Sequence, residues 1–272
     1  MKLLIQISDT HFGTEQPPVE EALVRLVLEQ APALIILSGD ITQRARRSQF
    51  RAARAFLNRL GDRPILTIPG NHDISLFNPV ARIFWPYKSY QSELGDNLEP
   101  EFESDELLAI AVNTTRNHRH IDGEVSQEQI ERVARRLERA ATNQLRIVVT
   151  HQPVWVTQTE DRHNLLHGHE EAVRGWASAG ADLILGGHIH LPYVGALHES
   201  FSGLPRRMWA VQAGTATSRR VRYGAGNSVN LIRYRSSRNE RYCVVERWDY
   251  QPESYCFAPV AFNELNCDLP DE

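Results

Sequence analysis

Short apolar runs alternate with amphipathic stretches along the first part of the chain. Three of the runs have the length and composition of buried strands, at 3–8, 33–38 and 64–69. Between them, residues 19–30 and 48–61 carry apolar side chains at helical spacing, and Gly61 can end the second helix. Strands and helices that alternate with short connections predict a βαβαβ unit with a parallel sheet.

The alternation continues along the middle of the chain and changes in its last quarter. Further apolar runs occur at 107–113, 145–151 and 182–188. Residues 126–140 have helical periodicity, and Ser126 with Gln129 fits an N-terminal capping box. The later stretches are typical of antiparallel strands joined by hairpin-like loops, at 208–218, 228–235 and 242–250.

The order of these elements predicts one mixed α/β domain. The sequence shows no internal repeat and no low-complexity linker that would separate two domains. We therefore expect a single domain over residues 1–250. Because chain ends are usually the least ordered part of a domain, we expect residues 251–272 to form a loosely packed C-terminal tail.

The composition is that of an ordinary globular protein, with 42% hydrophobic and 24% charged residues. A formal net charge of −4 and a sequence pI of about 6.3 argue against a general surface for nucleic acid or anionic membrane. The three cysteines form no CxxC pair, which argues against a disulfide framework and a zinc knuckle. The sequence shows no signal-peptide pattern and no membrane-length apolar run, so we expect a cytoplasmic protein.

Polar side chains that can bind metals follow five of the apolar runs. In chain order they are Asp9, His11, Asp40, Asn71, His151, His188 and His190. Because the carboxyl ends of parallel strands share one edge of a sheet, we expect these side chains to meet there. Nitrogen and oxygen donors without a thiolate suit Mn, Fe, Zn or Co. Seven donors exceed what one tetrahedral ion uses, and with one shared carboxylate they suit two ions.

Each motif taken alone also has a purely structural explanation. An Asp-x-His pair is frequent by chance, Gly39-Asp40 is a turn signal, and Asn71 could cap a helix. A buried histidine is more often a hydrogen-bonded core residue than a metal ligand. These explanations would all have to hold independently at five strand ends, so the combination indicates a metal site.

In this order and spacing, the motifs resemble those of the calcineurin-like metallophosphoesterases. The resemblance spans residues 3 to 234, and Asn71-His72-Asp73 is most similar to the class III cyclic-nucleotide phosphodiesterase branch. It implies a four-layer α/β/β/α sandwich of two mixed sheets and a centre of two metal ions, Mn, Fe or Zn. The implied reaction is attack on phosphorus by a hydroxide that bridges the two ions.

The resemblance also implies a role for each residue of the motifs. It assigns four ligands to the first ion, Asp9, His11, Asp40 and His190. It assigns four to the second ion, Asp40, Asn71, His151 and His188, so that Asp40 bridges the two. His72 is not a ligand in this assignment but a catalytic residue that points at the substrate phosphate. Asp73 is expected to orient the imidazole of His72.

Several other residues are candidates for contacts with the substrate. Arg44 follows the second strand end, and Asn113 and Arg116 follow the run at 107–113, so all three could bind the substrate. His163, His167 and His169 could form a lid between two strands that carry ligands. The basic run formed by Arg219, Arg220 and Arg222 is more typical of a protein surface.

Three functions stay open from the sequence. The first is a phosphodiesterase for a small diester such as a 3′,5′-cyclic nucleotide. The second is a metallophosphoesterase for another substrate, which could be a nucleic acid, a phospholipid-derived diester or a phosphomonoester. The third is a metal-stabilised scaffold without activity, which fits least because all the motifs are intact. We expect a small phosphodiester as partner and neither membrane nor nucleic acid, and leave open whether the chain forms a homodimer.

Overall fold

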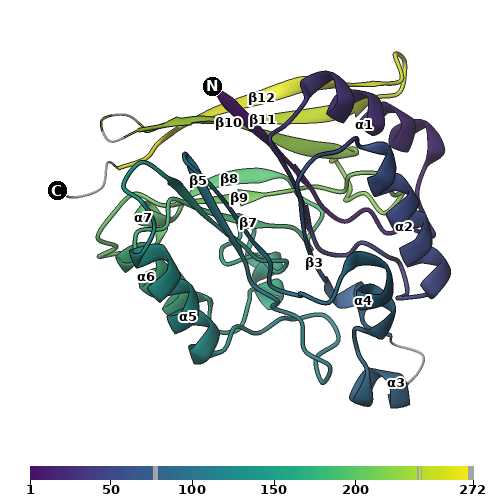
Figure 1. Ribbon diagram of the computed structural model, residues 1–272, viewed down its shortest axis with the longest axis horizontal. Helices are drawn as coiled ribbons and strands as arrows, with labels where there is room; N and C mark the ends of the chain where they lie inside the picture. The colour runs from purple at the N-terminus through teal and green to yellow at the C-terminus, as the bar shows by residue number, and fades with distance from the viewer. Residues whose placement is uncertain (76–78, 238, 240, 269–272) are drawn as a thin grey trace.

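Two six-stranded sheets form the centre of the molecule (Figure 1). The computed structural model describes residues 1–75, 79–237, 239 and 241–268. The first sheet contains β1 (Lys2–Ile7), β2 (Leu34–Ser38), β3 (Ile65–Ile68), β10 (Ser228–Ser236), β11 (Arg241–Gln251) and β12 (Cys256–Asn266). The second contains β4 (Glu101–Ser104), β5 (Leu107–Ala111), β6 (Leu145–Val149), β7 (Leu183–Gly186), β8 (Tyr193–Ala196) and β9 (Trp209–Gln212).

Both sheets are mixed. The first has the order β12-β11-β10-β1-β2-β3, with β1, β2 and β3 parallel and β10 to β12 antiparallel. The second has the order β4-β5-β6-β7-β9-β8, with β5, β6, β7 and β9 parallel and the two outer strands antiparallel. The parallel strands bring their carboxyl ends to one edge of each sheet.

Helices cover the outer face of each sheet. The described residues form the helices α1 (Pro17–Gln30), α2 (Arg47–Arg59), α3 (Pro79–Phe84), α4 (Lys88–Leu94), α5 (Gln127–Glu138), α6 (His169–Ser178) and α7 (Leu197–Ser200). Two short 3₁₀ helices, η1 (Asn71–Asp73) and η2 (Thr159–Asn164), follow β3 and β6. Figure 1 shows α1 and α2 on one side of the paired sheets and α5 and α6 on the other.

The alternation of side chains along the strands produces this layering. On β1, Ile5 and Ile7 belong to the core shared with α1 and α2, whereas Leu4 belongs to the core between the sheets. That central core also contains Leu107 and Ile147 from the second sheet. The fold is therefore α/β, with two mixed sheets packed face to face and flanked by helices, as the resemblance implied.

Local signals in the sequence are confirmed at two helix ends. α2 ends at Arg59, and Gly61 just beyond it has the left-handed φ of +84° that glycine accepts without strain. At the start of α5, Gln129 N donates to Ser126 Oγ at 3.2 Å, and Ser126 N donates to Gln129 Oε1 at 3.0 Å. This reciprocal pair is the expected capping box.

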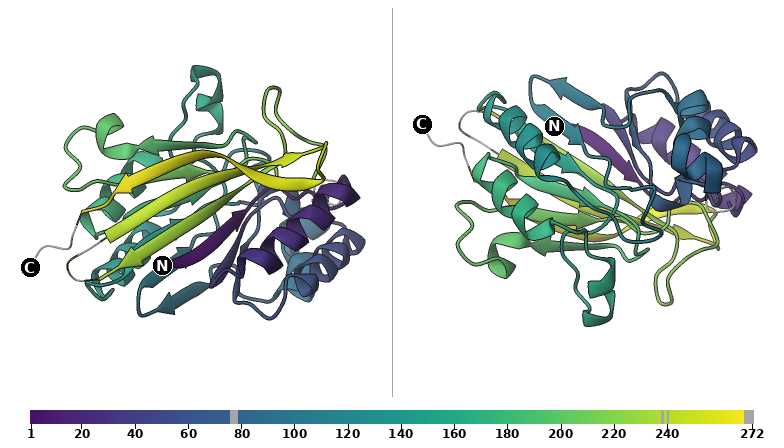
Figure 2. Two further views of the ribbon diagram at one scale, coloured as in Figure 1. Left: turned by 90° about the horizontal axis from the view of Figure 1, so that it is seen from above. Right: turned by 90° about the horizontal axis from the view of Figure 1, so that it is seen from below.

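Two expectations for the C-terminal part need correction. β9 was expected among antiparallel strands, but it pairs parallel with β7 and antiparallel with β8. The expected loose tail is wrong for Cys256–Asn266, which form β12 and pair with β11 along its length (Figure 2). Few β12 side chains are buried, so its apolar pattern is weak. The end of the expected tail, residues 269–272, lies outside the described residues.

Within the described part of the chain, no helix has both the length and the apolar character needed to cross a membrane.

Candidate metal centre

The candidate site lies where loops from both sheets meet. The loops after β1, β2, β3, β6 and β7 carry the predicted ligands, which are Asp9 and His11, Asp40, Asn71, His151, and His188 and His190. Hydrogen bonds tie these loops together. Asp9 N donates to Gly39 O at 3.1 Å, and Gly187 N donates to His151 O at 2.8 Å. The second sheet is linked to the first where His188 N donates to Asp9 Oδ2 at 3.0 Å.

Backbone strain is concentrated among these residues. Five of them have left-handed φ values, Asp9 (53°), His11 (43°), Asp40 (48°), His188 (74°) and His190 (58°). Residues other than glycine rarely adopt this conformation, which costs on the order of 1–3 kcal/mol each and persists where function requires it. The strain indicates that the fold holds these side chains in place for a purpose other than its own stability.

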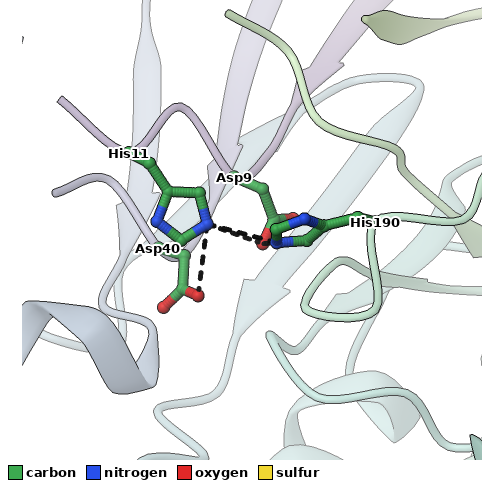
Figure 3. A group of neighbouring side chains, drawn as sticks. All are labelled: Asp9, His11, Asp40 and His190. Carbon is green, nitrogen blue, oxygen red and sulfur yellow. Dashed lines mark hydrogen bonds and ion pairs between the residues drawn. The ribbon is translucent and has the colours of Figure 1, made fainter. Parts of the chain in front are cut away.

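The first group of donors contains Asp9, His11, Asp40 and His190 (Figure 3). Their ligand atoms all lie within 4.8 Å of one another. His190 Nε2 is 3.3 Å from Asp9 Oδ1, and His11 Nε2 is 3.7 Å from Asp40 Oδ2. The imidazoles of His11 and His190 face each other with 3.2 Å between their Nε2 atoms. Nitrogen and carboxylate donors that converge in this way could hold one metal ion.

The second group contains Asp40, His151 and His188, whose ligand atoms also lie within 4.8 Å of one another. His151 Nδ1 donates to Ser38 O at 2.8 Å, which leaves Nε2 free to face Asp40 Oδ1 at 3.2 Å. The oxygen Asn71 Oδ1 lies 3.3 Å from the same Nε2. The two oxygens of Asp40 therefore face different groups, as a carboxylate shared by two ions would.

The arrangement of the donor atoms suits bound metal ions better than it suits hydrogen bonds among the side chains themselves. Neither ring nitrogen of the buried His188 has a hydrogen-bond partner among the described residues. Buried polar atoms are normally hydrogen-bonded, so an imidazole without partners at the centre of a donor group needs an explanation. A metal ion supplies one, and nitrogen and oxygen donors without a thiolate suit Mn, Fe or Zn.

The charges at the site are also suited to cation binding. Burial opposes ionisation of Asp9, but the charge of His190 outweighs it and lowers the pKa of Asp9 to about 2. Burial likewise opposes ionisation of Asp40, yet His151 and His72 hold the pKa of Asp40 well below its usual range. Both carboxylates are therefore ionised at neutral pH.

Two of the imidazoles at the site, those of His11 and His188, are unprotonated in the same range. Burial lowers the pKa of His11 to about 3 and that of His188 to about 3. A neutral imidazole has a free lone pair, which is the form that binds a metal.

His72 lies beside the two groups, and its orientation differs from the expectation. Its Nδ1 is 2.9 Å from the carbonyl oxygen of Gln43. A carbonyl can only accept, so Nδ1 carries the proton, and Nε2 lies 3.0 Å from Nη1 of Arg220. Gln43, rather than Asp73, orients this imidazole.

Asp73 instead clamps the backbone around the site. Its carboxylate accepts hydrogen bonds from Ile41 N at 3.0 Å, Thr42 N at 2.8 Å and Gly70 N at 2.8 Å. These bonds join the loop after β2 to the turn of η1. The expected contact of Asp73 with the His72 ring is absent among the described residues, so its orienting role is corrected to one in holding the loop.

The site opens into a cavity of about 220 Å³. Its lining includes predicted site residues and others that were not expected there. The lining residues are Asp40, Asn71, His72, Ile121, Asp161, Asn164, His188, Ile189, His190 and Arg220. Asp161 and Asn164 come from η2, and both oxygens of Asp161 accept from Arg222 Nη1 at 2.8 Å. In the sequence, the only trace of this wall is the short basic run of Arg219, Arg220 and Arg222, which is also typical of a protein surface.

The other substrate-binding candidates are not brought to this cavity. Arg116 donates to Gln129 Oε1 at 2.6 Å, beside the start of α5. The Asn113 side chain accepts from Thr115 N at 3.1 Å. Neither residue lines the described cavity, and Arg44 is exposed in the loop before α2.

The three histidines of the expected lid are also directed elsewhere. His163 lies in η2, and its Nδ1 is 2.7 Å from Glu160 O. His167 Nε2 is 2.7 Å from Asp122 Oδ2, and His169 begins α6. None of the three is among the residues described as lining the metal-site cavity.

Several solved structures share this fold. A dimetal phosphatase from Danio rerio aligns with a TM-score of 0.68 and 12% identity, covering 98% of this chain and 99% of that one. Purple acid phosphatase PPD1 from yellow lupin (Lupinus luteus) aligns with a TM-score of 0.66 and 12% identity, covering 91% of this chain. This alignment spans only 51% of the lupin chain. At these identities the likeness establishes the fold alone.

A third similar structure is GAP50, described as the anchor in the inner membrane complex of Plasmodium. It aligns with a TM-score of 0.58 and 12% identity, covering 98% of this chain and 89% of that one. No curated protein matches the sequence. The family model for calcineurin-like phosphoesterases matches residues 3–192, which include every predicted metal ligand. The chain therefore belongs to the calcineurin-like phosphoesterase family.

Proposed function

We propose that the chain is a two-metal phosphoesterase that hydrolyses a small phosphodiester, with a 3′,5′-cyclic nucleotide among the candidates. The observation that carries the proposal is the position of Asp40 between two groups of nitrogen and oxygen donors. The first ion would be held by Asp9, His11, Asp40 and His190. The second would be held by Asp40, Asn71, His151 and His188.

The two ions, when bound, supply a water of lowered pKa and neutralise charge on the phosphoryl oxygens. The residues of the chain position the ions and the substrate, and they supply protons. Asp40 would contribute a ligand to each ion, and the amide of Asn71 would add a ligand without adding charge around an anionic substrate. His72 Nε2 faces the cavity, and when the ring carries a second proton at this nitrogen it is placed to donate that proton to the leaving oxygen.

The cavity and the net charge support a small substrate. A volume of about 220 Å³ is below the size of typical drug-binding pockets. The formal net charge of −4 does not favour a long polyanion such as nucleic acid. An inactive scaffold is the weakest alternative, because the ligand set and His72 are all present.

A phosphomonoester is the second candidate. It is favoured by Arg220, a cation on the cavity wall in addition to the metal ligands. A monoester dianion carries more negative charge at phosphorus than a diester and would gain more from that cation. Two of the similar structures are also phosphatases by name.

A hydrolysis panel with Mn-loaded protein tests the proposal. Cyclic nucleotides, linear diesters, monoesters and single-stranded DNA are compared side by side, with chelator-treated protein as control. We expect metal-dependent turnover that is highest for a small diester. Monoester turnover far above that of every diester would replace the first candidate with the second.

A further inference from the structure

The segment between β9 and β10 directs the side chain of one arginine toward the candidate metal site. Along residues 219–222, exposed and partly buried side chains alternate. Arg219 and Val221 are exposed, whereas Arg220 lines the cavity and Arg222 binds Asp161 in its wall. Thr215 Oγ1 donates to Arg220 O at 2.8 Å and fixes the backbone at this point.

Arg220 is a cation without a carboxylate partner among the described residues. Its Nη1 lies 3.2 Å from Gln43 Oε1 and 3.0 Å from His72 Nε2. Within the part of the chain that the structure describes, no carboxylate lies within ion-pair distance of Arg220. By contrast, Arg222 contacts both oxygens of Asp161 at 2.8 Å. Of these two arginines, Arg222 is neutralised by the protein and Arg220 is available to an anion.

We propose that Arg220 is a substrate-binding residue whose guanidinium contacts a phosphoryl oxygen, above all the additional oxygen that a monoester or inorganic phosphate carries. This inference rests on the proposed function of the site. An incoming phosphoryl group offers a charged acceptor in place of the ring nitrogen His72 Nε2, and hydrogen bonds between two charged groups are the stronger kind. The exchange also releases Nε2 of His72, so that the imidazole becomes free to contact the leaving group.

The chemistry of the substrate decides how much Arg220 contributes. A diester has two non-bridging oxygens, which two metal ions can neutralise. A monoester dianion and inorganic phosphate have at least one more, and that oxygen needs a donor of its own. Arginine suits this task because its planar fork of N–H groups matches phosphate geometry. Arg220 should therefore contribute most to binding of the monoester and of phosphate.

The test compares Arg220→Ala and Arg220→Lys with Arg219→Ala, a matched control in the exposed neighbouring arginine. Metal content is measured in each Mn-loaded variant, and inorganic phosphate is the probe, by calorimetry and as an inhibitor. For Arg220→Ala we expect phosphate to bind about 10-fold to 100-fold more weakly, with wild-type metal content. Arg220→Lys should recover part of the loss, and Arg219→Ala should bind phosphate like the wild type.

The ester substrates identify which oxygen is held. A rise in KM for nitrophenyl phosphate that exceeds the rise for a methyl nitrophenyl diester assigns Arg220 to the additional oxygen. Equal rises assign it to an oxygen that both substrates share. Phosphate binding within twofold of wild type in Arg220→Ala would overturn the proposal. If the wild type hydrolyses no ester at all, the proposed function fails, whereas calorimetry with phosphate still tests Arg220.

Discussion

Asp40 Oδ1 lies 3.2 Å from Nε2 of His151. The two residues come from different sheets, since Asp40 follows β2 and His151 follows β6. The other oxygen of Asp40 faces His11, at 3.7 Å. One carboxylate thus connects the two donor groups and the two halves of the fold, so substitutions near Asp40 should affect both groups together.

Gly70→Ala should disrupt the centre through steric contact alone. A Cβ atom at Gly70 would lie 2.1 Å from the backbone N of Asp40 and 2.2 Å from its Oδ1. Because the obstacle is backbone, it cannot rotate away, and Asp40 must move. We expect a lower thermal midpoint and reduced metal content. Gly226→Ala is the control, because nothing lies within 4 Å of a Cβ there. Similar metal content in both variants would argue against a fixed position for Asp40.

His72→Ala should impair substrates according to their leaving groups. General acid catalysis typically contributes ~10²–10⁴-fold, and an alkoxide needs the proton more than a nitrophenolate does. We expect kcat/KM to fall by about that factor for an alkyl diester or cyclic nucleotide, and less for a nitrophenyl diester. Metal content should stay at the wild-type value. Equal losses on both substrates would instead assign His72 to binding of the phosphoryl oxygens.

Asp73→Asn should lower the stability of the fold rather than change how activity depends on the leaving group. The Asp73 carboxylate accepts from three backbone N–H groups, of Ile41, Thr42 and Gly70. An asparagine amide has one acceptor oxygen, so at least one buried N–H loses its partner, at a cost of about 1–3 kcal/mol. We expect a lower midpoint in chemical denaturation. Asp62→Asn, at an exposed position, serves as control and should denature like the wild type. An unchanged midpoint for Asp73→Asn would contradict the role of Asp73 in holding the loop.

The three cysteines should differ in reactivity. Burial raises the pKa of Cys243 well above its usual value and that of Cys267 to about 12, whereas Cys256 is exposed. A raised pKa keeps a thiol protonated at pH 8, and the thiolate is the reactive form. A disulfide reagent at that pH should titrate one thiol per native chain and three after denaturation. Rapid reaction of a second thiol in the native protein would contradict the burial of Cys243 and Cys267.

The positions of the metal donors could be predicted because they depend on strand order and strand ends. The runs that end before Asp9, Asp40 and His151 are mostly apolar and almost wholly buried, and buried parallel strands leave such a signal. β12 left no comparable signal, since only Phe257 and Leu265 along it are buried.

Contacts that depend on loop conformation could not be predicted. Arg220 reaches His72 across 148 residues of sequence, from a segment without hydrophobic periodicity. The role of Asp73 depends on the 3₁₀ turn of η1, which directs the carboxylate to backbone N–H groups and away from the neighbouring imidazole. In the sequence, nothing distinguishes Arg220 from an arginine in a surface run. Likewise, nothing distinguishes Asp73 from a carboxylate that orients the neighbouring ring.

The central claim is that two ions share Asp40, and metal analysis of three proteins tests it most directly. Protein prepared without chelator should bind two ions per chain at saturation. Asp40→Ala should lower the occupancy of both sites, whereas His190→Ala should lower only one, because His190 belongs to the first donor group alone. A wild-type protein that binds a single ion at saturation and is fully active would contradict the account.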